Sequence, residues 1–196
     1  MVMQPKDRIF KFLEKNDFVT FEEATDMGVS KLVLSRLCAQ GILHRPARKI
    51  YTTYLDWLTE PLRKYAPACA LYSDAVICGV SALIYHELTD EEEIKVWLAF
   101  PRAHRVVNAE YRTIYPSGSA YSLGIETQWV GCRQVRIYDC EKSVVDAFKY
   151  LSVEVAHQAL RKYLRKRDKD LNKLSHYAKQ LRKPLDEIIA IFLASH

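Results

Sequence analysis

The sequence predicts a two-domain α+β protein. A small helical N-terminal domain with a β-hairpin precedes a larger domain that has a small mixed or antiparallel sheet and C-terminal helices. Apolar residues recur at helical spacing up to Gly41 and again after Glu141, whereas β-branched and aromatic stretches bounded by Pro, Gly and Ser lie between them. With 196 residues, of which 49% are hydrophobic and 27% charged, the chain can bury a substantial core.

The chain up to Gly28 is predicted to form two short helices. The first runs from about Pro5 to Asn16, and its proline is tolerated in a first turn. Thr20 and Glu23 have the spacing of a capping box, in which the hydroxyl accepts from the N3 amide and the carboxylate accepts from the cap amide. A short second helix therefore follows Thr20 and ends at Gly28.

A third helix is expected between Ser30 and Gly41. The hydroxyl of Ser30 can cap its start, and Gly41 favours the left-handed conformation of a helix stop. Helical spacing turns part of its apolar residues toward a core. The inward-facing residues are Val29, Val33 or Leu34, and Leu37.

Three helices, a tight turn between the second and third, and a β-hairpin are the arrangement of a winged helix-turn-helix. Strands from Ile42 to Arg45 and from Ile50 to Thr53 form the hairpin around the sequence PARK. In such a domain the third helix enters the major groove of double-stranded DNA and the hairpin lies over the phosphate backbone. The predicted DNA-binding residues are Lys31, Ser35 and Arg36 on the helix, and Arg45, Arg48 and Lys49 on the hairpin.

A different interpretation stays open for this domain. Lysine and arginine side chains on a helix are often simply solvated, and winged helices also bind proteins. The net charge of +5 permits a nucleic-acid partner without requiring one. Acidic residues of the second helix, including Glu22, Glu23 and Asp26, offset much of the nearby basic charge, so the basic face is local.

The N-terminal domain is expected to span residues 1–55, with a connecting segment at 56–67 and a C-terminal domain at 68–196. The C-terminal domain should begin with an apolar helix over residues 74–88. The expected strands are IKVWLAF, YRTIYP, ETQWV and CRQVRIYD, the last two joined around Gly131 as a tight hairpin or a bulged strand. The expected helices are EKSVVDAFKYL, VEVAHQALRKYLRKRD, LNKLSHYAKQL and a last one from Pro184.

The helices near the C-terminus are strongly basic. Ten lysines and arginines but two aspartates lie between Arg161 and Lys183. This basic segment could contact nucleic acid or an acidic partner, or it could be a solvated helix face. Asp146, on the preceding helix, is expected to form a structural pair rather than to act in catalysis.

No catalytic residue, metal or cofactor is expected. The sequence has neither GxxxxGK[ST] nor GxGxxG. His86, Glu87 and Asp90 fall within about one helical turn, but they lack the second histidine of HExxH. Glu93 and Lys95 have the spacing found in some metal-dependent nucleases, so a nuclease stays one alternative.

The sequence also bears on the cellular compartment. The five cysteines form no CxxC pair, so neither a disulfide framework nor a zinc site is indicated, and reduced thiols fit the cytosol. The N-terminal residues lack a hydrophobic signal core. Because no apolar run approaches the roughly 20 residues of a membrane-spanning helix, we expect a cytoplasmic protein without a membrane partner.

The segment GVSKLVLSRLCAQGILHRPARKIY resembles the N-terminal helix-turn-helix and wing of the AbiEi family of antitoxins, from abortive-infection (type IV) toxin-antitoxin systems. VSALIYHELTDE with VWLAFPRAHR, and VGCRQVRIYDCEKSVVDAF, resemble later segments of this family, so the resemblance spans nearly the whole chain. Two places depart from the family pattern. Lys49 follows Arg48 where Arg-Gly is usual, and Lys142 and Ser143 stand where Arg-Thr is common.

The resemblance implies a phage-defence antitoxin that represses its own operon through the winged helix. Its C-terminal domain would counteract a toxin that resembles nucleotidyltransferases, without requiring a stable complex, and no toxin-contacting residues are assigned. A module of this size recognises only a few base pairs, so repeated half-sites in the operator DNA are expected. The alternative is a winged-helix transcriptional regulator whose second domain binds a ligand or mediates oligomerisation, with no toxin partner.

Overall fold

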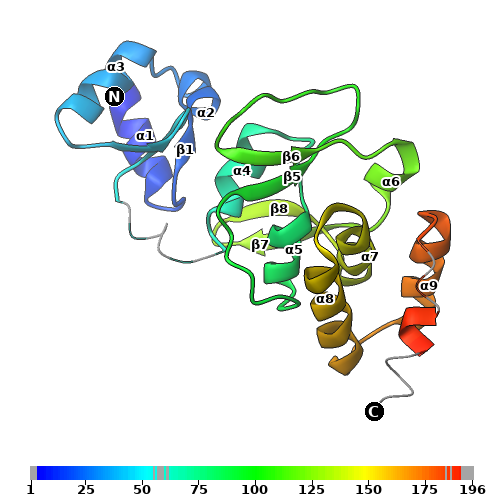
Figure 1. Cartoon of the computed structure of the whole chain (residues 1–196). Helices are drawn as coiled ribbons and strands as arrows, with labels where there is room; N and C mark the ends of the chain where they lie inside the picture. Colours follow the sequence, from blue (N-terminus) through cyan, green and yellow to red (C-terminus); the bar gives the residue numbers. More distant parts are fainter. Residues whose placement is uncertain are drawn as a thin grey trace. The chain divides into compact units, whose positions relative to one another are not determined.

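The computed structural model describes residues 4–54, 56, 60, 62–183, 185 and 187–190. They form helices together with a three-stranded and a five-stranded sheet, so the protein belongs to the mixed α and β class (Figure 1). The chain divides into two compact units. Unit 1 comprises Met1–Ser73 and Gln128–Val135, and unit 2 comprises Asp74–Thr127 and Arg136–His196. Unit 1 thus includes the segment expected as a connection, together with a short stretch from much later in the chain.

Unit 1 begins with three short helices, of which α2 and α3 start at the predicted caps. They are α1 (Pro5–Leu13), α2 (Phe21–Asp26) and α3 (Lys31–Ala39). The capping box of α2 is confirmed, because Thr20 Oγ1 accepts from the Glu23 amide at 3.1 Å and the Glu23 carboxylate accepts from the Thr20 amide at 2.8 Å. The Ser30 hydroxyl accepts from the Val33 amide at 3.4 Å and caps α3.

The helix ends follow from local hydrogen bonds and from glycine. α1 ends at Leu13 rather than at Asn16, because the Asn16 side-chain amide donates to the Phe12 carbonyl at 2.9 Å in place of a continued backbone ladder. Gly28 and Gly41 follow α2 and α3 with φ of 80° and 69°, as the sequence predicts. This left-handed region favours glycine, which has no Cβ to clash.

The three helices share one apolar core in unit 1. Leu34 and Leu37 are the buried residues of α3, and Val29 is buried just before its cap, whereas Val33 is only half-buried. The inward face of α3 therefore runs through Leu34 and Leu37. The other buried members of this core are Ile9, Val19, Ala24, Leu43 and Tyr51.

A small antiparallel sheet completes unit 1, together with α4 (Tyr65–Leu71). Its strands lie in the order β1-β3-β2. They are β1 (Val19–Thr20), β2 (His44–Ala47) and β3 (Ile50–Thr52). β1 was not expected, and it pairs Val19 with Tyr51.

The hairpin starts later than predicted. The amides of Ile42 and Leu43 both donate to the Leu37 carbonyl, at 3.0 and 3.2 Å, and so they finish α3 instead of opening the strand predicted from Ile42. β2 also continues through Pro46, which is tolerated because β2 is an edge strand. The turn between β2 and β3 therefore contains only Arg48 and Lys49.

The five-stranded sheet is mixed. Its order is β6-β5-β4-β8-β7, with β4 antiparallel to β5 but parallel to β8, and β5 parallel to β6. The strands are β4 (Val76–Ile77), β5 (Val96–Ala99), β6 (Tyr111–Ile114), β7 (Ile125–Val130) and β8 (Arg133–Tyr138).

The predicted helix over residues 74–88 is wrong in its first part. Val76 and Ile77 form the central strand, and α5 (Gly79–Tyr85) begins only after it. Both residues are β-branched and fully buried, which favours a strand flanked on both sides.

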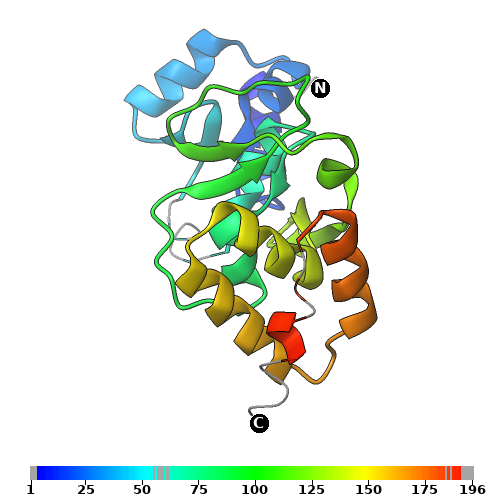
Figure 2. The same ribbon diagram turned by 45° about the vertical axis from the view of Figure 1, so that its right-hand side comes forward.

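Helices of unit 2 pack around α7 (Figures 1 and 2). A short α6 (Gly118–Ser122) precedes β7. Then α7 (Cys140–Tyr150), α8 (Val153–Arg165) and α9 (Leu171–Gln180) follow β8 as predicted, each capped by the side chain of Asp139, Ser152 or Asp170. Of the helix predicted from Pro184, residues 187–190 are helical, whereas 184, 186 and 191–196 lie outside the described residues. Buried members of this core include Leu83, Val144, Val145, Leu160, Tyr163 and Leu174.

Candidate nucleic-acid interface

The two sides of α3 differ in exposure. Leu34 and Leu37 are buried in the core of unit 1, whereas Lys31, Ser35 and Arg36 are exposed. Because residues four apart lie on one helix face, Lys31 and Ser35 are surface neighbours, and Leu32 and Arg36 form the adjacent pair. The polar side chains of α3 are thus placed as the helical pattern predicts, and their contact with DNA stays a prediction.

The three predicted cations of the hairpin are also exposed. Arg45 lies on β2, and Arg48 and Lys49 form the turn. Lys49 has φ of 63°, so the position where the AbiEi pattern has glycine adopts the left-handed conformation here. Its carbonyl accepts from the Phe21 amide at 2.8 Å, and its ammonium lies 3.0 Å from a Glu22 carboxylate oxygen. This exposed ion pair contributes little to stability.

The hairpin cations lie beside different helices. Arg45 is close enough to α3 for its charge to favour the Cys38 thiolate, although burial has the larger effect and raises the pKa of the Cys38 thiol. Lys49 instead lies beside α2 through its contact with Glu22. Unit 1 therefore groups Arg45 with α3 and places Lys49 near the start of α2.

Glu23, one of the acidic residues of α2, pairs with an arginine from much later in the sequence. Arg133 belongs to unit 1 and donates to both carboxylate oxygens of Glu23, at 2.6 and 3.1 Å, and to the Phe18 carbonyl at 3.0 Å. Its guanidinium also lies 4.7 Å from the centroid of the Phe18 ring. Burial raises the pKa of Glu23, but hydrogen bonds from Arg133 and the Thr20 amide outweigh it, and the pKa is lowered. The charge of Glu23 is thus offset by Arg133 within unit 1, and no pattern in the sequence indicates this contact.

Most lysines of the basic segment, Arg161 to Lys183, contact other residues of unit 2. Two of them pair with carboxylates: Lys162 lies 2.5 Å from Asp90, and Lys173 lies 3.1 Å from Asp139 and 3.0 Å from Glu141. Two others donate to backbone carbonyls: Lys166 to that of His86 at 3.4 Å, and Lys169 to that of Lys166 at 3.0 Å. Burial lowers the pKa of Lys173, but its two carboxylate partners outweigh that effect and raise it. For these lysines the contacts favour a structural role over a contact with nucleic acid.

Another lysine of unit 2, Lys142, is completely buried. The ammonium of Lys142 donates to Asp146 and lies 4.2 Å from the centroid of the Tyr138 ring. Its side chain has no exposed surface, and that of Asp146 is 4% exposed. Burial raises the pKa of Asp146 against the opposing effect of Lys142. Asp146 therefore forms the structural pair that the sequence predicts.

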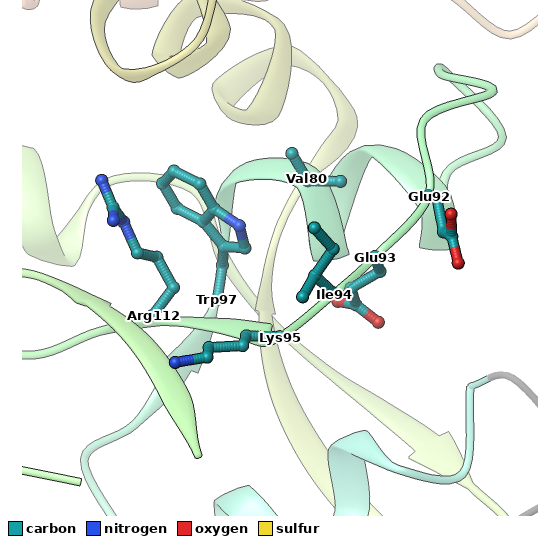
Figure 3. Close-up of a pocket in the computed structure, with 7 residues that line it drawn as sticks. All are labelled: Val80, Glu92, Glu93, Ile94, Lys95, Trp97 and Arg112. Carbon is teal, nitrogen blue, oxygen red and sulfur yellow. The ribbon is translucent and has the colours of Figure 1, made fainter. Parts of the chain in front are cut away.

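The residues of the nuclease alternative, Glu93 and Lys95, line a pocket of about 220 Å³ in unit 2. Glu93 accepts a hydrogen bond from the Ser81 hydroxyl, and the guanidinium of Arg112 lies 5.3 Å from the centroid of the Trp97 ring. Figure 3 shows the Lys95 side chain directed away from the Glu93 carboxylate. The two residues thus share a pocket, but their charged groups do not meet at one point in it.

The three residues considered as metal ligands have separate surroundings. His86 Nε2 lies 2.7 Å from the Tyr138 carbonyl, and burial lowers the pKa of His86. Asp90 pairs with Lys162, and Glu87 is exposed. Within the described ranges, no group of three or more His, Cys, Asp or Glu side chains is arranged to hold a metal ion.

Comparisons with known proteins concern the fold. No family model matches the chain. No curated protein matches it either. Among solved structures, the Rv2827c protein from Mycobacterium tuberculosis is similar with a TM-score of 0.58 and 14% identity, over 91% of this chain and 72% of that chain. The similarity to Rv2827c thus shows a shared fold.

In the part of the chain that the structure describes, no helix has both the length and the apolar character needed to cross a bilayer.

Proposed function

We propose that unit 1 is a winged helix-turn-helix that binds double-stranded DNA through α3. One observation carries this proposal: α3 buries Leu34 and Leu37 and exposes Lys31, Ser35 and Arg36. A helix held against a core by one side can lie in the major groove with the other. The hairpin of β2 and β3 follows α3 directly and supplies the wing.

The exposed residues divide into two roles. Side chains on the recognition helix contact base edges and nearby phosphates, whereas cations on the wing contact phosphates and fix the register on the duplex. Lys31, Ser35 and Arg36 take the first role, and Arg45, Arg48 and Lys49 take the second. The ion pair between Arg133 and Glu23 supports this assignment, because it offsets one of the negative charges of α2.

The resemblance to AbiEi antitoxins supports a wider proposal. The protein is a cytoplasmic antitoxin that represses its own toxin-antitoxin operon by binding repeated half-sites in the operator. Unit 2 counteracts a toxin resembling nucleotidyltransferases, and direct contact between the two proteins is not required. The segments that resemble the family lie in both units, which supports assigning both activities to one chain.

A ligand-responsive transcriptional regulator without a toxin partner is the second candidate. The pocket in unit 2 favours it, because a cavity of about 220 Å³ lined by Trp97, Lys95 and Arg112 offers an aromatic surface and two cations to a small molecule. A neighbouring gene whose product arrests growth, and is counteracted by this protein, would argue against this candidate.

Binding to the protein's own upstream region tests the DNA-binding proposal. The full-length protein is titrated against a labelled upstream fragment and a scrambled fragment across a salt series. We expect preferential, salt-sensitive binding that is lost in Lys31→Ala/Arg36→Ala but kept in Lys11→Ala/Lys15→Ala, which removes two cations from α1 and the loop after it. Equal binding of both fragments by the wild type would reject sequence-specific recognition of the operator, and binding of neither fragment would indicate a protein-binding winged helix.

Single substitutions separate the two roles. Arg36→Ala should cost about 1 to 3 kcal/mol on the specific fragment and relax its specificity, because a base contact is removed. Arg48→Ala should weaken both fragments alike and reduce the salt slope by about 1, because a phosphate contact is removed. An equal loss on specific and scrambled DNA for Arg36→Ala would refute its assignment to base edges.

The antitoxin proposal needs its own test. The product of the neighbouring gene is expressed from an inducible promoter, with or without this protein supplied from an unrelated promoter. Growth arrest that is relieved by both wild type and Lys31→Ala/Arg36→Ala is expected, because neutralisation is assigned to unit 2. Absence of relief by the wild type would reject the antitoxin role while leaving DNA binding untouched.

A further inference from the structure

Leu32 is a large apolar side chain on the exposed part of α3, and 60% of its surface is exposed. It lies in the first turn of the helix, directly after Lys31. Ser35 and Arg36 follow it by three and four positions, so the three share one helix face. A single exposed leucine is ordinary on a protein surface. What distinguishes Leu32 is that its neighbours on this face are the polar and cationic side chains assigned to DNA.

We propose that Leu32 contacts the 5-methyl group of a thymine in the major groove and gives each half-site a preference for thymine at one position. This inference rests on the proposed DNA binding by α3. The thymine methyl group is an apolar feature of the major-groove edge, and apolar side chains recognise it by direct contact. Residues near the N-terminus of a recognition helix are the ones that contact base edges, and Leu32 is the second residue of α3.

The spacing along α3 also places this thymine relative to another base. Leu32 and Arg36 are four residues apart, which corresponds to about 6 Å along a helix axis. Base pairs follow each other at about 3.4 Å, so the bases contacted by these two residues lie within about two base pairs of each other. Arginine most often pairs with guanine through O6 and N7. The half-site should therefore contain a thymine and a guanine at this spacing.

The charge around Leu32 favours DNA over a protein as its partner. The centre of a protein–protein interface is depleted of charged residues. The face of α3 around Leu32 instead carries the exposed cations Lys31 and Arg36. Such a face fits the major groove of a duplex. There the apolar methyl group of thymine lies among polar base edges, and the phosphate backbone runs along both sides of the groove.

A thymine-to-deoxyuridine scan tests the contact, since deoxyuridine lacks only the methyl group. Full-length protein first selects its preferred site from a library of random duplexes. Synthetic duplexes of that site then carry deoxyuridine at each thymine in turn, and Kd is measured for wild type, Leu32→Ala and Val153→Ala. Val153→Ala is the matched control, because it trims another exposed aliphatic side chain, which is 65% exposed on α8.

We expect one thymine position at which deoxyuridine weakens binding by wild type and Val153→Ala about fourfold, the effect of one buried methyl group. Leu32→Ala should bind the two duplexes equally well. A guanine about two base pairs away should lose its importance in Arg36→Ala. Thermal unfolding of Leu32→Ala should match wild type, because the side chain is largely exposed.

Three outcomes would overturn the inference in distinguishable ways. Selection of no preferred duplex would reject the proposed DNA binding itself. A specific site at which deoxyuridine has no effect, or weakens Leu32→Ala as much as wild type, would reject the thymine contact and leave the proposed function standing. A change of oligomeric state in Leu32→Ala, measured by sedimentation, would assign the side chain to a protein contact instead.

Discussion

The two cations of α3 and two lysines of unit 2 lie in different environments. Lys31 and Arg36 are exposed, and they form no ion pair with the residues that the structure describes. Lys142 and Lys173 contact carboxylates, and Lys142 is fully buried. Removing a charge from water costs free energy that a carboxylate partner offsets, so Lys142 belongs to the folded core, whereas Lys173 keeps 34% of its side chain exposed beside its two carboxylates. The exposed cations remain available to an anionic ligand, a distinction that a count of basic residues does not reveal.

The largest effect is expected from breaking the buried pair of unit 2. Asp146→Ala should lower the free energy of unfolding by about 3–5 kcal/mol, because the charge of Lys142 would stay buried without its carboxylate. Urea unfolding followed by circular dichroism measures this change. Asp168→Ala, which removes an exposed aspartate, should change stability by only about 0.5 kcal/mol. Similar losses in both variants would mean that burial of Lys142 carries no particular cost.

A smaller effect is expected from the tyrosine that shares a carboxylate with Lys173. The Tyr177 hydroxyl donates to Asp139 at 3.0 Å, and burial together with the Asp139 charge raises the pKa of Tyr177 to about 12. A tyrosine in the unfolded chain titrates at about pH 10. The stabilisation by the Tyr177–Asp139 hydrogen bond is therefore fully present below that pH and is lost as the pH rises toward 12.

Tyr177→Phe should therefore lose about 1 kcal/mol at neutral pH and show a flatter fall in stability above about pH 10. Free energies of unfolding measured from pH 8 to 12 check both expectations. Tyr54→Phe, which changes an exposed tyrosine of unit 1, is the control. A wild-type slope in Tyr177→Phe would contradict the expected link between this hydroxyl and Asp139.

The smallest stability change is expected at Lys49, where an exposed cation is removed. Lys49→Gly should stabilise the protein by roughly 0.5 kcal/mol, because glycine relieves the left-handed strain while making the unfolded chain more flexible. The same change should weaken binding to all duplexes and reduce the salt slope by about 1. Lys49→Ala matches it in charge but keeps the strain, so it should be the less stable of the two. A loss of stability in Lys49→Gly comparable to that of Asp146→Ala would mean that the exposed ion pair with Glu22 stabilises the protein as much as the buried pair does.

Elements of unit 1 could be predicted because their signals are local. Thr20 and Glu23 cap α2 across three positions, and Ser30 caps α3 in the same way. The same locality explains the error at the hairpin. Ile42 and Leu43 resemble the start of a strand, but their amides are used by the Leu37 carbonyl at the end of α3.

The features that could not be predicted depend on distant parts of the chain. Val76 and Ile77 lie next to an apolar helical run, and they form a strand because β5 and β8 lie on either side. The contact between Glu23 and Arg133 joins residues 110 positions apart, and neither residue carries a local pattern that indicates the other. For the candidate interface, the sequence predicted which side chains of α3 are exposed but not that Glu23 would form an ion pair with Arg133.

The contribution of residues 128–135 to unit 1 has a consequence for the order of events during synthesis. The ribosome completes α1, α2 and α3 long before it reaches Arg133, the partner of Glu23 and the Phe18 carbonyl. At about 5–20 residues per second, the interval between residues 73 and 133 lasts about 3–12 s. Until then the nascent N-terminal helices hold Glu23 without its arginine, so α3 is made first and the ion pair on α2 is completed only after residues 74–127 of unit 2 have been made.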